Sequence, residues 1–167
     1  METMNRDEGI AKIRELIREI EFCMLTTVDD EGRLHSRPMA ASNPGEFDGD
    51  LWFFTYGRSH KGYEVGQNRQ VNCAFAHPGR QSYVSASGKA SLVRDRDEIR
   101  RRWRAPFAAW FPNGIDEPDL ALLRVDVETA EYWDAPSSVV AHAIALVKTQ
   151  VLGQRPDPGD NKVVNLH

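Results

Sequence analysis

The pattern of hydrophobic and polar residues along the chain predicts a mainly β protein with a few helices. Apolar residues recur at helical spacing between charged ones over residues 6–20, which predicts an amphipathic packing helix. A second helix is expected at residues 59–68, begun by the N-cap type residue Ser59. A third is expected at residues 95–104, where acids precede arginines as the helix dipole favours. Apolar and β-branched runs predict strands at residues 22–28, 34–42, 51–55, 70–77, 82–93, 120–127 and 131–133.

For two of these strands the sequence also predicts the position in the sheet or the burial of the faces. Pro38 lacks a backbone donor, so the strand at residues 34–42 must be kinked, bulged or at a sheet edge there. Polar and apolar residues alternate too little over residues 51–55 for one face of that strand to be in water. Short strands separated by turns roughly every 8–12 residues predict a small antiparallel split β-barrel with flanking helices, an α+β fold.

The chain shows no internal repeat and no linker, so we expect a single domain over residues 1–167. A last apolar segment at residues 139–151 precedes a polar C-terminal tail at residues 154–167. We expect that tail to become ordered only where a partner surface binds it.

Composition narrows the function classes. A formal net charge of −4 argues against a nucleic-acid binder, and the basic stretch at residues 100–104 is explained by pairing with acids earlier in the same predicted helix. No stretch approaches the roughly 20 apolar residues of a membrane span, and residues 1–21 lack a signal-peptide core. Cys23 and Cys73 are interpreted as reduced, buried thiols. These features predict a cytoplasmic protein without membrane or nucleic-acid partners.

Metal and nucleotide-loop motifs are not found. The five histidines show no metal-ligand spacing, so we expect no metal site. The sequence also contains no GxGxxG and no P-loop, which says nothing against a ligand site in a barrel.

The candidate chemistry lies where the apolar run at residues 51–54 leads into Ser59, His60 and Lys61. Side chains of these types at a helix start favour an anion, because the first N–H groups of a helix are unpaired. Arg37, on what we interpret as a neighbouring strand, can reach the same end of the sheet. Such a cluster would hold a phosphate, and the adjacent aromatic residues would hold a planar ring.

A plainer interpretation of the same residues stays open at this point. Lys61 and Arg58 can be solvated loop residues, and Trp52, Phe53 and Phe54 can be ordinary core residues. Residue types alone do not decide between the two interpretations.

The order of motifs resembles the FMN-binding split-barrel superfamily of pyridoxamine 5′-phosphate oxidase, and especially its general stress protein 26 branch. The matching pieces after the first predicted helix are FCMLTTV at 22–28, SRPM at 36–39, WFFT at 52–55, SHK at 59–61, YVSASGKASLVRD at 83–95, WFPNG at 110–114, AEYWD at 130–134 and GDNKVVNL at 159–166. The resemblance covers nearly the whole chain, although no single piece is diagnostic.

The resemblance implies that flavin mononucleotide (FMN), or alternatively FAD, lies in a groove between the two subunits of a homodimer. Phe54 and Thr55 would contact the ring edge through their backbone, and Trp110 or Trp133 would cover the ring unless they are interface aromatics. The residues that the resemblance assigns to the flavin and its ribityl chain are Arg37, Pro38, Met39, Phe53, Phe54, Thr55 and Trp110.

Ser59, His60 and Lys61 match the Ser-Arg-Lys that clamps the phosphate in the oxidases. His60 replaces the arginine, so a permanent charge gives way to a group type that titrates at about pH 6.5.

Two functions follow from this resemblance, and the sequence leaves both open. The first is an FMN-dependent oxidoreductase, in which the flavin supplies the redox chemistry. The second is a flavin-binding general stress protein that acts as a reservoir or sensor without turnover. A pyridoxamine 5′-phosphate oxidase-like enzyme and an interaction module without flavin are further alternatives. No residue is assigned as catalytic.

Overall fold

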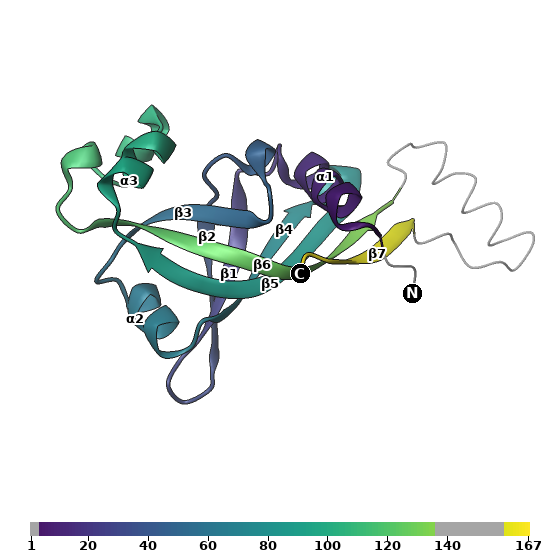
Figure 1. The fold of residues 1–167 in the computed structure, drawn as a ribbon, viewed down its shortest axis with the longest axis horizontal. Helices are drawn as coiled ribbons and strands as arrows, with labels where there is room; N and C mark the ends of the chain where they lie inside the picture. The colour runs from purple at the N-terminus through teal and green to yellow at the C-terminus, as the bar shows by residue number, and fades with distance from the viewer. Residues whose placement is uncertain (1–3, 136–158) are drawn as a thin grey trace, which may run out of the picture.

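Within residues 4–135 and 159–167, which the computed structural model describes, seven antiparallel strands form one curled sheet with three α-helices at its margins (Figure 1). The elements are α1 (Arg6–Ile17), β1 (Phe22–Val28), β2 (Leu34–Ala40), η1 (Pro44–Glu46), β3 (Asp50–Tyr56), α2 (His60–Gln67), β4 (Gln70–His77), η2 (Pro78–Arg80), β5 (Ser82–Val93), α3 (Arg96–Arg102), η3 (Ala105–Ala109), η4 (Gly114–Asp116), β6 (Leu120–Asp134) and β7 (Asp160–Asn165), where η marks a 3₁₀ helix. The split-barrel α+β class is confirmed, and β1, β4 and β5 match the predicted strands residue for residue.

The sheet is split between β2 and β3. The strand order is β2-β1-β4-β5-β6-β3, so these two strands stand at opposite ends of the sheet, and β7 pairs with the second half of β6. The curled sheet brings the ends together at one bridge, Ala41 to Phe53, and one bond from the Ser42 N–H to the Trp52 carbonyl. Our expectation that β2 and β3 are neighbours therefore holds only at this seam. Pro38 lies on the edge strand β2, as its missing donor predicted.

The two strands predicted at residues 120–127 and 131–133 are one continuous strand, β6. The register between β5 and β6 shifts at Gly88, and Glu128 falls between the paired residues as the extra residue of a bulge. Gly88 permits the close approach, because a Cβ there would lie 2.0 Å from the carbonyl oxygen of Asp126. A bulge bends a strand without ending it, which is why the sequence pattern predicted two strands where the structure has one.

Two apolar clusters hold the fold together. One fills the barrel beneath α1 and includes the fully buried Phe53 of β3. The other lies on the opposite face of β3, where Trp52 and Phe54 pack against α3 and η3. Both faces of β3 are therefore covered, as its weak alternation predicted. Among the helices of the described residues, none is both long and apolar enough to cross a membrane.

The end of the chain is part of the barrel. Val164 and Leu166 are buried in the main core, and β7 pairs with β6 from Thr129 to Asp134. Gly9 lets α1 approach this strand, since a Cβ there would lie 2.1 Å from Val164 Cγ1. The expectation that this tail needs a partner surface is therefore wrong for residues 160–166. The apolar segment predicted at 139–151 lies outside the described residues.

Candidate functional site

A groove of about 250 Å³ lies at the seam where β2 and β3 approach each other. Its lining is mostly apolar and comes from three distant parts of the chain: the β1–β2 pair, the end of β3 with the start of α2, and the η3 segment. The lining residues are Phe22, Pro38, Met39, Ala40, Phe54, Thr55, Tyr56, Lys61, Phe107, Trp110 and Phe111. Six of the ten residues predicted for the site are among them.

One wall of the groove is aromatic and partly exposed. The rings of Phe22 and Trp110 meet edge to face with centroids 6.0 Å apart, and these side chains are 43% and 49% exposed. The Tyr56 hydroxyl donates to the Trp110 carbonyl at 3.3 Å. Phe107 and Phe111 pack against Phe54 behind them, which anchors this segment on β3. The wall therefore offers two partly exposed aromatic rings on a fixed backbone, and either ring can stack on a planar group.

Lys61 introduces a cation into this apolar groove. Burial lowers the pKa of Lys61, and the nearby charge of Arg37 lowers it further. Two cations are thus held close together at one end of the groove, where an anion would stabilise both.

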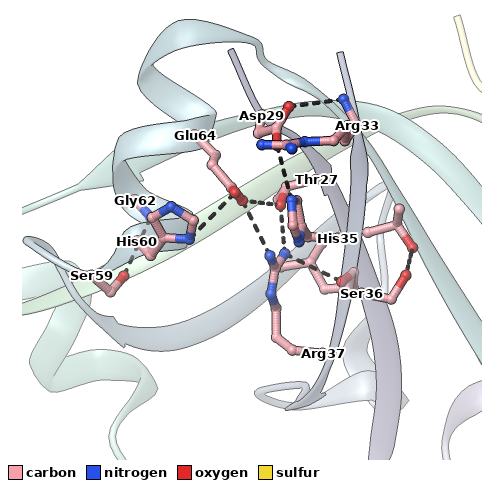
Figure 2. A network of polar contacts seen from close by, with 12 residues as sticks. Thr27, Asp29, Arg33, His35, Ser36, Arg37, Ser59, His60, Gly62 and Glu64 are labelled. Carbon is pink, nitrogen blue, oxygen red and sulfur yellow. Dashed lines mark hydrogen bonds and ion pairs between the residues drawn. The ribbon is translucent and has the colours of Figure 1, made fainter. Parts of the chain in front are cut away.

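Arg37 is held from behind by β1 and α2 (Figure 2). Its Nη1 donates to the Thr27 hydroxyl at 2.6 Å and more weakly to the Leu25 carbonyl at 3.4 Å. Its Nη2 donates to Oε2 of Glu64 at 3.1 Å, and the Thr27 hydroxyl donates to the same oxygen. The arginine is therefore fixed in position by partners within the protein.

Glu64 is the least expected member of this cluster, because its side chain is only 1% exposed. Burial by itself would raise the pKa of Glu64, but the Thr27 hydroxyl and the charge of Arg37, with smaller effects of His60 and His35, hold it below the usual value. The carboxylate is therefore ionised in the neutral range. Its second oxygen, Oε1, accepts no hydrogen bond from the part of the chain that the structure describes, although Nδ1 of His60 lies 3.4 Å away.

The start of α2 supplies further donors. Ser59 is its N-cap and accepts from the Gly62 N–H at 3.3 Å, as predicted, and its hydroxyl lies 3.3 Å from that of Thr55. Among the described residues the N–H groups of His60 and Lys61 have no acceptor. These free N–H groups and the positive end of the helix dipole favour an anion at this point.

A second polar cluster closes the hairpin between β1 and β2. Asp29 accepts from the backbone N–H of Arg33 and Glu31 and from the side chains of Arg33 and His35. These donors hold the pKa of Asp29 far below its usual range. The cluster fixes the hairpin, and the ring of His35 stands 6.3 Å from that of His60.

Four of the predicted site residues do not line the groove. Phe53 points into the barrel core, and its backbone is paired with Leu123 of β6 and bridged to Ala41. The other three, Arg37, Ser59 and His60, lie next to the groove. Ser59 and His60 directly precede the lining residue Lys61, and the charge of Arg37 lowers the pKa of Lys61.

Sequence reasoning missed Thr27 and Glu64, and also five residues that line the groove: Phe22, Ala40, Tyr56, Phe107 and Phe111. One signal for Glu64 was present, because it follows His60 by four residues in the predicted helix and so shares its face.

A larger hollow of about 320 Å³ lies between α3 and the start of β3. Its lining carries three acids and three arginines: Glu46, Asp48, Asp50, Arg101, Arg102 and Arg104. Because its charges largely neutralise one another, we place the candidate site in the smaller, apolar groove.

The chain is similar to known proteins over most of its length. The family model described as pyridoxamine 5′-phosphate oxidase like matches residues 8–157. Protein bli-3 of Neurospora crassa is 27% identical over 157 residues, covering 89% of this chain and 75% of that protein.

Two solved structures are similar in fold. The general stress FMN/FAD binding protein of Xanthomonas citri is 33% identical, with a TM-score of 0.68 over 80% of this chain and 93% of that one. The general stress protein 26 of Bacillus anthracis is 22% identical, with a TM-score of 0.66 over 75% of this chain and 93% of that one.

Proposed function

Because the chain belongs to the pyridoxamine 5′-phosphate oxidase-like family, we propose that it binds a flavin nucleotide, FMN in the first place, in the groove between β2 and β3. One observation carries the proposal: an apolar, aromatic groove ends at a partly buried lysine that a second cation, Arg37, accompanies. A planar ring with an anionic tail matches both parts of that site.

The donors at the polar end fit a phosphomonoester. Lys61 offers an ammonium, and the free N–H groups at the start of α2 offer neutral donors. Arg37 offers the part of its guanidinium that its internal partners leave unused. Charge-assisted bonds of this kind each contribute about 1.5–3 kcal/mol. The apolar wall of Phe22 and Trp110 lies on the side where the ring would stack.

We propose further that two copies of the chain complete the groove. About 250 Å³ is small beside the roughly 300–1,000 Å³ of typical ligand pockets, and the aromatic wall is half exposed. The outer face of the sheet next to the groove carries a row of exposed, uncharged residues: Met24, its cross-strand neighbours Pro38 and Ala74, and Phe22. A two-fold partner on this face would cover the row and supply the missing wall.

The chain's own residues favour binding and positioning over acid–base chemistry. A bound flavin would supply hydride or electron transfer. Of the residues that line the groove, Lys61 and Tyr56 carry ionisable protons, and the others are apolar apart from the Thr55 hydroxyl. We therefore propose a flavin-binding protein of the general stress type, with an FMN-dependent oxidoreductase as the second candidate.

The test is the visible absorption spectrum of the purified protein, followed by titration of the flavin-free protein with FMN, FAD and riboflavin. We expect stoichiometric FMN and its loss in an Arg37→Ala, Lys61→Ala double variant. A matched control, Arg100→Ala with Lys89→Ala, removes the same two charge types from exposed positions and should retain the flavin. A folded wild-type protein that ignores added FMN would overturn the proposal. Bleaching of the bound flavin by NAD(P)H and re-oxidation in air would favour the enzyme.

A further inference from the structure

A buried carboxylate stands directly behind the candidate phosphate site. Glu64 is almost completely shielded from water, and it is ionised in the neutral range. A negative charge at this position would repel a phosphate, and burying it is costly unless partner groups compensate it. Its presence beside a phosphate site therefore calls for an explanation. Its two oxygens make different contacts, and each suggests a part of that role.

The first oxygen, Oε2, orients Arg37. Of the five guanidinium N–H donors, the two on Nη1 go to Thr27 and Leu25, and one on Nη2 goes to Glu64. The N–H of Nε and the second N–H of Nη2 have no acceptor within residues 4–135 and 159–167. Covalent geometry places these two on one edge of the planar group, the edge that binds a phosphate through two parallel bonds.

The second oxygen, Oε1, faces His60. Nδ1 of the imidazole lies 3.4 Å from it, and no other donor among the described residues reaches this buried atom. A neutral imidazole that presents its N–H to Oε1 has a lone pair on Nε2, which repels a phosphate oxygen. An imidazolium presents N–H groups on both sides, so it can face the carboxylate and a phosphate together.

We propose that Glu64 is a positioning residue of the phosphate end: it sets the free edge of Arg37 and orients His60 so that His60 binds a phosphate only as the imidazolium. This inference rests on the proposed flavin binding and adds which residue controls it. The side chain of His60 is mostly exposed, so a ligand can reach it from solvent.

Few other charged or titratable groups of the described residues lie near Glu64 and His60. Arg37 and His35 approach from β2, and His35 is itself bonded to Asp29 in the hairpin. On α2, Lys61 follows His60. From the strand packed against α2, β5, the apolar Leu92 faces Gly62. His35 is therefore the one further histidine near this site in the described chain, and a His35→Gln variant separates its contribution.

These charges determine whether the preference for FMN over riboflavin rises or falls with pH. As pH falls from about 8 to about 6.5, histidine side chains gain protons, while the phosphomonoester keeps most of its second charge because its pKa is about 6. The preference for FMN over riboflavin, which lacks the phosphate, should therefore increase about five- to tenfold over this range.

The experiment measures dissociation constants of FMN and riboflavin by flavin fluorescence at both pH values. His60→Arg should show a strong FMN preference that is nearly independent of pH. Glu64→Gln should flatten the pH dependence to less than about twofold, because an amide N–H facing Nδ1 leaves the proton of a neutral imidazole on Nε2. His35→Gln should keep the wild-type dependence.

The outcomes separate the two proposals. If FMN binds and its preference over riboflavin changes equally with pH in wild type, His60→Arg and Glu64→Gln, the inference is overturned and the proposed function stands. If the folded wild type binds neither flavin, both are overturned. Should Glu64→Gln fail to fold, the His60→Arg comparison decides alone, since His60 is exposed.

Discussion

The indole of Trp110 and the ring of Phe22 pack edge to face, with 74° between their planes. Phe22 begins the first strand, and Trp110 follows the η3 turn beyond α3. Their contact joins the two ends of the groove wall and leaves about half of each ring open to solvent. An exposed aromatic pair on a fixed backbone can stack against a planar ligand.

Replacing Trp110 by alanine should weaken FMN binding about three- to tenfold, because one aromatic stacking contact contributes about 0.5–1.5 kcal/mol. Titration of flavin fluorescence measures the change. Leu34→Ala is the control, since it removes an exposed apolar side chain at the hairpin, outside the groove. Equal affinities for the Trp110 variant and the wild type would contradict a ring stacked on this wall.

A charge on the outer face of β1 should separate the proposed dimer. Met24→Lys places an ammonium between Pro38 and Ala74, in the row that a partner would cover. We expect monomers in sedimentation at low micromolar concentration and a parallel loss of FMN, because the groove would lose its second wall. Leu34→Lys places the same charge on the same face but at the hairpin end of β2, four residues before Pro38, and should remain dimeric. A monomeric wild type that retains FMN would rule out a shared groove.

The hairpin cluster predicts an acid-sensitive contribution to stability. The pKa of Asp29 is lowered in the folded protein, so its carboxylate stabilises the fold above the unfolded-state pKa of about 3.9. That contribution is lost as the pH falls below this value toward the folded-state pKa. Asp29→Asn should therefore lower the melting temperature at neutral pH, and the difference from wild type should narrow toward pH of about 3. A constant difference across this range would be inconsistent with the cluster.

The basic stretch on α3 should act through packing. The guanidinium of Arg102 lies 3.8 Å from the centre of the Trp52 ring, and its side chain is 17% exposed. Arg102→Ala should lower the free energy of unfolding by about 1–2 kcal/mol. Arg100→Ala should cost less than about 0.5 kcal/mol, since Arg100 is exposed and, within the described residues, has its ion pair with Asp97 alone. Denaturant titration at one fixed protein concentration compares them, and equal losses would rule out the stacking role.

Several features were predictable because their causes are local. The strands at residues 22–28, 70–77 and 82–93 follow from apolar and β-branched runs between turns. The cap by Ser59 acts within three residues of itself, so its hydroxyl identifies the start of α2. Pro38 indicated an edge strand because a missing donor has the same consequence in any sheet.

Other features depended on contacts between distant segments. Glu64 looked like an ordinary helix acid, but the packing of α2 against β1 and β2 buries it beside Thr27 and Arg37. The last residues looked like a loose polar tail, but β6 has room for β7 beyond the end of β3. Neither the burial of Glu64 nor the pairing of β7 alters the local order of polar and apolar residues, so the sequence pattern could not predict them.

The order of residues therefore decided which segments are strands and helices, and which of them carry phosphate-binding and aromatic side chains. Folding decided how these side chains are used, because closing the sheet brings β2 to β3 and brings the η3 segment against β1. A single strand or helix start holds an anion weakly. The groove arises only where an apolar wall, a lysine and an arginine held by a buried carboxylate meet across the seam.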